Sequence, residues 1–291
     1  MHALVKIAGL LRKNPRLALN KIRTTLRDKW FAQADYRAGQ GRAHPPSTVC
    51  LKLTNACNLR CKMCGQPREG HKPGDIKYAP PEYFQQKLAL QPYKRLIDEL
   101  KPQRPNLYLW GGEPFLYPDI IPLIEYAKSH QFTVQVNTNG LPLKRLAEAI
   151  VRSGLDDLII SIDGPCKVHD QVRGRAGTFE RVKQGLEAIQ AHKKRLGVSR
   201  PLIRVRGTIS PYNFDTIADL IPIAEDLNAD SLGYNWTWFT TRQTGEAYEK
   251  FMKQVFDTHA PSWRPFESDV ILDPDRHRKY RSEERRLGKE C

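Results

Sequence analysis

The stretch Cys57-Asn-Leu-Arg-Cys61-Lys-Met-Cys64 places three of the six cysteines of a 291-residue chain on one short segment. Iron–sulfur clusters take soft thiolate ligands, and a cubane cluster normally takes four of them. Three thiolates leave one iron without a protein ligand, much as catalytic zinc sites keep one position open for chemistry. A zinc site with one further ligand and an electron-transfer cluster are alternatives, but zinc motifs favour paired C-x2-C units. The sequence therefore favours an iron–sulfur site with an open iron.

The segments around this motif alternate between strand-like and helix-like patterns. Strands that alternate with helices predict an α/β fold with a parallel sheet, and six of them fit a partial (β/α)6 barrel. The predicted strands are Thr48–Thr54, Asn106–Trp110, Thr133–Thr138, Leu158–Asp163, Leu202–Ile209 and Asp230–Trp236. The predicted helices are Pro81–Leu100, Ile120–His130, Leu143–Ser153, Thr178–Leu196, Phe214–Leu227 and Gly245–His259.

Short polar and glycine-rich runs follow these strands. The cysteine motif follows the first strand, Gly111–Pro114 the second, Asn137–Gly140 the third, and Ser161–Gly164 ends the fourth. Function gathers at the carboxyl ends of strands in such barrels, so we expect these runs to meet at one mouth. A loop that contains Cys166 and His169–Gly174 comes next, and Thr178 is placed to cap the helix that it opens.

Taken together, the runs CNLRC, GGEP, NTNG, SIDG, HDQVRG and GTF resemble the radical S-adenosylmethionine (radical SAM) superfamily over roughly residues 48–236. The resemblance implies a [4Fe-4S] cluster on Cys57, Cys61 and Cys64 whose open iron chelates S-adenosylmethionine. An electron from a reductant such as flavodoxin or ferredoxin would cleave this cofactor to a 5′-deoxyadenosyl radical, which abstracts hydrogen from a peptide or small-molecule substrate. The family usually has an aromatic residue before the last cysteine, and this chain has Met63.

The same resemblance implies a set of contacts to S-adenosylmethionine. Glycines let a backbone approach a ligand closely, and the planar fork of an arginine suits a carboxylate. Residues like Ser161 and Arg173 contact the cofactor's carboxylate in peptide-modifying members of the family. Asp and Asn in these runs are also ordinary turn residues, which is the structural alternative. The implied contacts are Gly111, Gly112, Glu113, Pro114, Asn139, Ser161, Asp163 and Arg173.

Two pairs of side chains are candidates for a substrate pocket. Arg204 and Arg206 share one face of the fifth strand, and if the apolar face meets helices they point into the barrel. There they would bind a carboxylate or phosphate, or form a structural ion pair. Tyr234 and Trp236 end the sixth strand, where they would form a substrate or adenine wall, or pack in the core.

The sequence divides into four parts. Residues 1–47 form a basic helical leader and linker, residues 48–260 the barrel, and residues 261–280 the start of a C-terminal extension. The last eleven residues, RSEERRLGKEC (281–291), resemble the translation of a sequencing adapter. The motif set is most similar to members with a SPASM or twitch domain, so we expect that such an extension is truncated here.

Charge is the remaining signal, with a formal net charge of +15. Residues 1–43 hold ten Lys or Arg and two acids in an amphipathic pattern, which suits a packed surface helix, anionic lipid or an acidic partner. Modification of RNA is an alternative function, but most of the excess charge lies in this leader and no RNA-binding module is evident. A chain with clustered cysteines and no evident export signal or membrane span is expected to be cytoplasmic.

Overall fold

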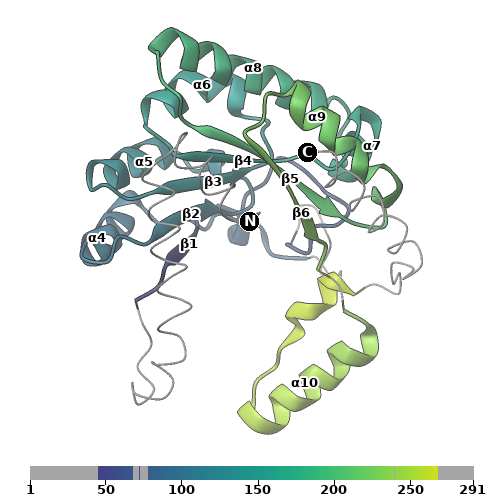
Figure 1. Cartoon of the computed structure of the whole chain (residues 1–291). Helices are drawn as coiled ribbons and strands as arrows, with labels where there is room; N and C mark the ends of the chain where they lie inside the picture. Colours follow the sequence, from purple (N-terminus) through teal and green to yellow (C-terminus); the bar gives the residue numbers. More distant parts are fainter. Residues whose placement is uncertain (1–44, 68–71, 73–77, 239, 268–291) are drawn as a thin grey trace, which may run out of the picture.

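A computed structural model describes residues 45–67, 72, 78–238 and 240–267 of the chain. Six parallel strands form one sheet in the order of the sequence, from β1 to β6 (Figure 1). They span Thr48–Lys52, Asn106–Trp110, Val134–Thr138, Asp157–Ser161, Leu202–Ile209 and Ser231–Trp236. The helices lie along the outer side of this curved sheet, so the predicted α/β architecture of a partial (β/α)6 barrel is confirmed.

The α-helices and three short 3₁₀ helices alternate with the strands. The α-helices are α3 (Pro81–Gln85), α4 (Leu90–Leu100), α5 (Ile120–Ser129), α6 (Leu143–Arg152), α7 (Cys166–Arg173), α8 (Thr178–Leu196), α9 (Leu220–Asp226) and α10 (Arg242–Phe256). The 3₁₀ helices are η1 (Pro114–Leu116), η2 (Phe214–Asp219) and η3 (Pro261–Phe266). None of the helices in the described part of the chain is long and apolar enough to cross a bilayer.

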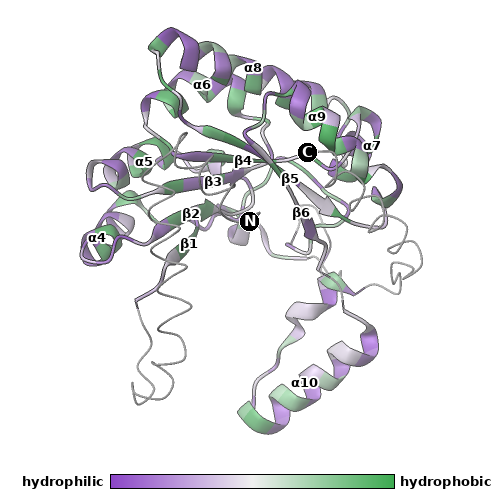
Figure 2. Cartoon of the chain, in the orientation of Figure 1, coloured by the Kyte–Doolittle hydropathy of each residue, from purple (hydrophilic) through white to green (hydrophobic). Residues whose placement is uncertain are grey.

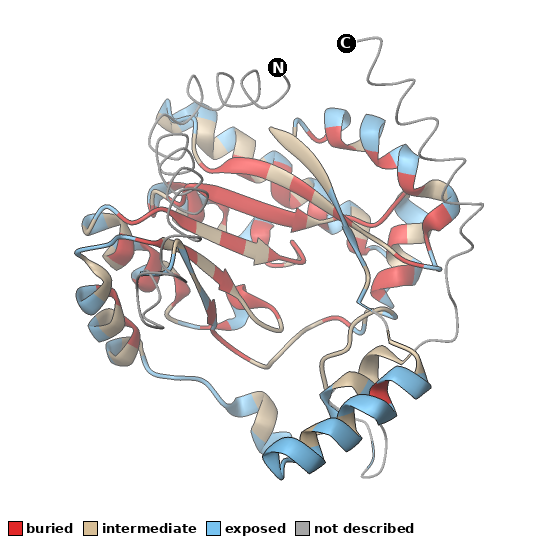
Figure 3. Cartoon of the chain, turned by 60° about the horizontal axis from the view of Figure 1, so that its bottom comes forward, coloured by how far each residue is buried: buried red, intermediate tan, exposed pale blue. Residues whose placement is uncertain are grey.

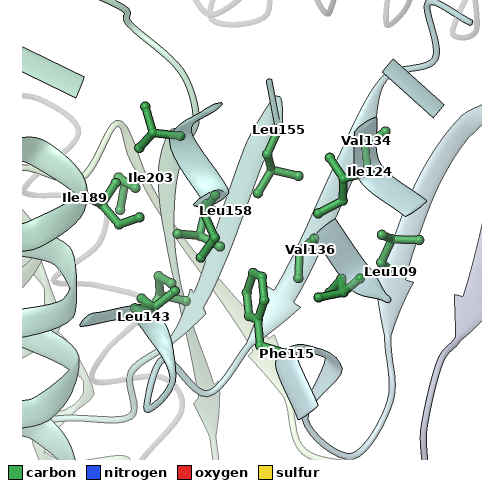
Figure 4. Packing of buried hydrophobic residues seen from close by; sticks show 14 of the residues in the cluster. Leu109, Phe115, Ile124, Val134, Val136, Leu143, Leu155, Leu158, Ile189 and Ile203 are labelled. Atoms are coloured by element: carbon green, nitrogen blue, oxygen red, sulfur yellow. The ribbon is translucent and has the colours of Figure 1, made fainter. Parts of the chain in front are cut away.

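Strand alternation separates the two faces of the sheet. Leu109, Val136 and Ile203 point outward, where they pack against helix residues such as Ile124 and Ile189 (Figure 4). Burial of this apolar layer is the main favourable term in folding. Figure 2 shows the apolar residues along the sheet and the helix faces turned toward it. The inward-facing positions of the same strands are mostly polar and only partly buried, and they line the barrel interior.

Two predicted helices are interrupted, each because of a proline. The segment 81–100 divides into α3 and α4, since the ring of Pro92 would clash with the carbonyl of Leu88 in a continuous helix. The segment 214–227 divides into η2 and α9, and Pro222 stands in the same relation to Ala218.

The predicted loop before α8 contains a helix instead. Pro165 precedes α7, and Gly174 ends it with a φ of 70°. This Pro-before, Gly-after pattern is a known helix boundary signal. Cys166 is therefore the first residue of a helix, and the loop prediction was wrong.

Helix α10, which follows β6, projects away from the barrel (Figure 1). Helix α10 begins three residues before the predicted start because the Thr241 hydroxyl caps it by accepting a bond from Thr244 N at 3.2 Å. Most of α10 is exposed (Figure 3). Beyond it, the Phe266 ring occupies the place that a Cβ on Gly65 would fill, so η3 packs against the end of the cysteine loop. The predicted basic leader up to residue 44, and everything after residue 267, lie outside the described residues.

Candidate functional site

The three cysteines of the motif line one hollow at the carboxyl end of β1. This hollow is open to solvent, and it is bordered by Gly111 and Gly112 after β2. The loop is anchored on two sides, because Glu113 N donates to Ala56 O at 2.8 Å and Lys62 N donates to Val172 O at 2.8 Å. The cysteine motif thus folds around the hollow, and its three thiols line it.

Burial makes these thiols difficult to ionise on their own. It raises the pKa of Cys57 to about 11, and it also raises the pKa of Cys61 although the positive charge of Arg173 opposes the shift. The Arg173 guanidinium donates to Cys61 Sγ at 3.8 Å. Thiolates in such a place need a strong positive charge nearby, which bound iron would supply.

The donor set suits a cluster. Three thiols border one open hollow, and each of them would bind a different iron of a cubane. In the described part of the chain, no three Cys, His, Asp or Glu side chains converge as ligands of a single metal ion would. The thiolate ligands of a cluster bind different iron atoms, so they need not converge in this way.

The two glycines after β2 are required by a close approach of two backbones. A Cβ on Gly112 would lie 2.1 Å from Ala56 O, and one on Gly111 would lie 2.6 Å from Thr54 O. Gly112 N donates to Thr54 O at 2.8 Å across this contact. The glycines therefore let the turn lie directly against the cysteine loop.

Glu113 is turned into the protein and is fully buried. Its carboxylate accepts bonds from Thr138 Oγ1 at 2.6 Å, Asn139 N at 2.8 Å and Phe115 N at 3.1 Å. Burial raises the pKa of Glu113 to about 7, and these three donors offset only part of the shift. Pro114 is also buried, at the start of η1. Both residues thus pack beneath the turn and support it.

Asn139 lies between β3 and the cysteine loop. Its Nδ2 donates to Asn58 Oδ1 at 2.8 Å and lies 4.0 Å from Cys57 Sγ, while its Oδ1 accepts a bond from Leu141 N at 3.0 Å. The side chain therefore fixes the loop and holds an N–H group beside a cysteine sulfur.

The run after β4 forms a buried polar cluster beside the same loop. Arg173 Nε lies 2.6 Å from Asp163 Oδ2, and this carboxylate together with Cys61 raises the pKa of Arg173 despite its burial. His169 Nδ1 accepts a bond from Asp163 N at 3.2 Å. Ser161, the last residue of β4, is partly exposed. Arg173 thus joins α7 to both the β4 turn and the second cysteine.

Thr178 does not cap α8, contrary to prediction. It is the first helical residue, and its hydroxyl donates backward to Arg175 O at 2.7 Å. Asp170 on α7 performs the capping role, since its carboxylate accepts bonds from Gly177 N at 2.5 Å and Phe179 N at 2.8 Å. A cap from another helix cannot be read from local sequence spacing.

The two arginines of β5 have different environments. Both point into the barrel, and the apolar residues between them face the helices, as predicted. Arg204 forms an ion pair with buried Asp157 at 2.8 Å, so it has the structural role that the sequence left open. Arg206 lies one layer nearer the mouth, in register with Ser161.

Tyr234 and Trp236 are not in the barrel interior. They pair in register with Gly207 and Ile209, and a Cβ on Gly207 would meet Leu220 on the outer side. Strand alternation therefore puts both rings on the outer face, where they are 38% and 51% exposed. The alternative of core packing was therefore wrong, and a contact with substrate or adenine stays a prediction. β6 is an edge strand, and in the described part of the chain η2 and α9 lie along its outer face.

Sequence reasoning missed one organising residue, Asn213. Its Nδ2 donates to Asp163 O at 2.7 Å and Thr208 O at 2.9 Å, and its Oδ1 accepts a bond from Ser210 N at 2.8 Å. It therefore ties the end of β4 to the end of β5. The signal available was an Asn in a turn two residues after Pro211, which is too common to single out.

Comparison with known proteins agrees with this geometry. Residues 51–221 match the Radical SAM superfamily. The AdoMet-dependent heme synthase of Methanosarcina barkeri is 29% identical over 187 residues, which are 63% of this chain and 48% of that protein. The mycofactocin maturase MftC of Mycobacterium ulcerans is 33% identical over 150 residues, which are 49% of this chain and 37% of that protein.

Among solved structures, Streptococcus suis SuiB bound to its precursor peptide SuiA superposes with a TM-score of 0.55 at 14% identity. The match covers 83% of this chain and 52% of SuiB, and it shows a shared fold. The family match spans more than half of the chain, so the chain belongs to the radical SAM superfamily. It spans about half the length, or less, of the curated relatives that it matches. Enzymes of this superfamily use a [4Fe-4S] cluster together with S-adenosylmethionine.

Proposed function

We propose that this chain cleaves S-adenosylmethionine reductively at a [4Fe-4S] cluster held by Cys57, Cys61 and Cys64. The cluster would supply an electron and an open iron, which yield a 5′-deoxyadenosyl radical that abstracts hydrogen from a substrate. The observation that carries the proposal is the shared hollow of these three cysteines with Gly111 and Gly112.

The other residues of the site act as a scaffold for that chemistry. Gly111 and Gly112 bring the turn after β2 against the cysteine loop, beside the hollow where a methionine amine would lie. Ser161 and Arg173 are at the mouth, where a carboxylate of the cofactor would be placed, and Asn139 and Asp163 hold the two turns on either side. Arg173 would contribute positive charge beside Cys61, which favours the thiolate form of that ligand.

The substrate is proposed to be a peptide or a small molecule. The curated relative MftC is a maturase and SuiB was solved with a precursor peptide, which supports the first class. The relative from M. barkeri is a heme synthase, which supports the second. A low-potential carrier such as flavodoxin or ferredoxin would provide the electron.

The test uses anaerobically reconstituted protein. We expect roughly four irons per chain, as a cubane requires, and release of 5′-deoxyadenosine on addition of dithionite and S-adenosylmethionine. Cys61→Ala should lose both, while Cys166→Ala, a matched change at an exposed cysteine, should keep both. A wild type that binds iron but releases no 5′-deoxyadenosine would indicate an electron-transfer module instead of a radical enzyme. Zinc in place of iron would overturn the proposal.

A further inference from the structure

The inner face of the sheet carries positive charge that no described carboxylate balances. Among the inward-facing strand positions, Asp157 is the single carboxylate, and it is already paired with Arg204 and hydrogen-bonded by Gln135 at 2.5 Å. Arg206 and Lys52 also face the interior, and neither forms an ion pair with any described residue. Lys52 instead lies over the rings of Tyr83 and Trp110, at 5.6 and 5.8 Å from their centroids.

The Arg206 side chain occupies space that a residue without a side chain leaves open on the neighbouring strand. A Cβ on Gly233 of β6 would lie 1.4 Å from Arg206 Nη1, so the guanidinium occupies space beside β6 that only a glycine leaves open. Its backbone carbonyl accepts a bond from Ile162 N at 3.0 Å, which fixes the strand beside the end of β4. The side chain is thus oriented although no acidic partner orients it.

The groups facing Arg206 across the interior are neutral and polar. Tyr108 on β2 is close enough that the charge of Arg206 opposes the rise in the pKa of its hydroxyl caused by burial. Asn137 on β3 hydrogen-bonds Tyr108, and its own Oδ1 is buried without a hydrogen-bond partner in the described structure. A partly buried cation surrounded by neutral groups is costly unless an anion joins it.

We propose that Arg206 binds an anionic group of the substrate, a carboxylate or a phosphate, inside the barrel and beneath the mouth that carries the cysteines. The inference rests on the proposed function, because it places the substrate within reach of that mouth. The planar fork of an arginine binds either anion through two parallel hydrogen bonds, and a neutral group would leave the charge unpaired. Arg206 would therefore select for anionic substrates and fix their orientation.

The experiment measures binding of simple probes to the reconstituted full chain by titration calorimetry. The probes are phenylacetate, phenyl phosphate and the neutral isostere phenylacetamide, which separate carboxylate from phosphate and charge from shape. We expect one of the two anions to bind and Arg206→Gln to weaken it roughly ten-fold or more, the loss typical of a charged hydrogen bond. Arg206→Lys should lose less, because it keeps the charge but not the fork.

Arg145→Gln, an equal change at an exposed arginine of α6, should bind the anion as the wild type does. If Arg206→Gln fails to fold, Gly233→Ala tests the same point, since its methyl group displaces the guanidinium. Equal binding of phenylacetamide, no binding of either anion, or full affinity in the Arg206 variants would overturn the proposal. Release of 5′-deoxyadenosine by the wild type, measured without probes, reports separately on the proposed function.

Discussion

The carboxylate of Glu113 accepts a hydrogen bond from the backbone N–H of Asn139 at 2.8 Å and thereby joins the turn after β2 to the turn after β3. Both turns touch the cysteine loop, one through Glu113 N and the other through Asn139 Nδ2. Glu113 and Asn139 together therefore join three separate segments of the site.

Glu113→Gln should destabilise the fold. One carboxylate oxygen would become an NH2 group facing donors, and an unsatisfied buried polar group costs about 1–3 kcal/mol. Urea unfolding of the two proteins measures the difference, with Glu99→Gln on the exposed side of α4 as the control. A variant as stable as the wild type would show that the network is not important for folding.

The effect of Glu113 should also depend on pH. Its folded pKa is raised to about 7 by burial, above the ordinary value of 4.5, so the folded state binds this proton more tightly than the unfolded state. The stabilisation is fully present below pH 4.5 and is lost as the pH rises toward 7. The wild type's advantage over Glu113→Gln should therefore shrink across this window, and an advantage that grows with pH would contradict the burial of an acid there.

His169 should contribute an acid sensitivity of the opposite sign. Burial, aided by Arg173, lowers its pKa well below 6.5, and its Nδ1 must stay unprotonated to accept the bond from Asp163 N. Its contribution is present above pH 6.5 and is lost as the pH falls below that value. His169→Asn keeps an acceptor but cannot titrate, so its unfolding free energy should change less between pH 6.5 and 5. If the unfolding free energy changed equally with pH in both proteins, His169 would not be buried as a neutral ring.

Asp170 should behave as the N-cap of α8 although it belongs to α7. Asp170→Ala removes the acceptor for Gly177 N and Phe179 N, and loss of a cap typically costs about 1 kcal/mol. Asp170→Asn retains an acceptor oxygen and should cost less. Thermal unfolding of the two Asp170 variants measures which of them is less stable. Thr178→Val, which removes the residue predicted as the cap, should leave the capping bonds in place.

Gly112→Ala should prevent assembly of the cluster site. The new methyl group would fall 2.1 Å from Ala56 O, so the cysteine loop must move away from the turn. Iron content after reconstitution is the measurement, and we expect it to fall sharply. Gly197→Ala is the control, because it strains a backbone with a φ of 64° at the end of α8 but meets no atom within 4 Å. Retention of full iron by Gly112→Ala would show that the loop tolerates the displacement.

Much of this arrangement could be predicted from the sequence because it depends on local patterns. The Cys57–Cys64 spacing, the glycines at 111 and 112, and the alternation of Ile203 and Val205 with arginines each have a direct structural consequence. What could not be predicted depends on tertiary partners. The Asp170 cap and the hydrogen bonds of Asn213 join segments from different elements. The outward direction of Tyr234 depends on the register of an edge strand.

The two arginines of β5 show this limit most clearly, and they give the last prediction. Their sequence context is the same, yet Arg204 pairs with a carboxylate that is fully buried, whereas Arg206 has no described acidic partner. Arg204→Met should therefore destabilise the fold by about 3 kcal/mol, because it leaves the charge of Asp157 buried and unpaired. Arg206→Met should change stability little, since it removes a cation and leaves no carboxylate unpaired.

Double variants distinguish the loss of the Arg204–Asp157 ion pair from general packing effects. Asp157→Asn should recover part of the stability lost in Arg204→Met, because the uncompensated charge is then gone, but it should give no recovery in Arg206→Met. Urea unfolding of the four proteins and the wild type measures both comparisons. Equal losses in the two single variants would mean that Arg206 also has a structural partner, and its assignment to a substrate anion would then lose its main support.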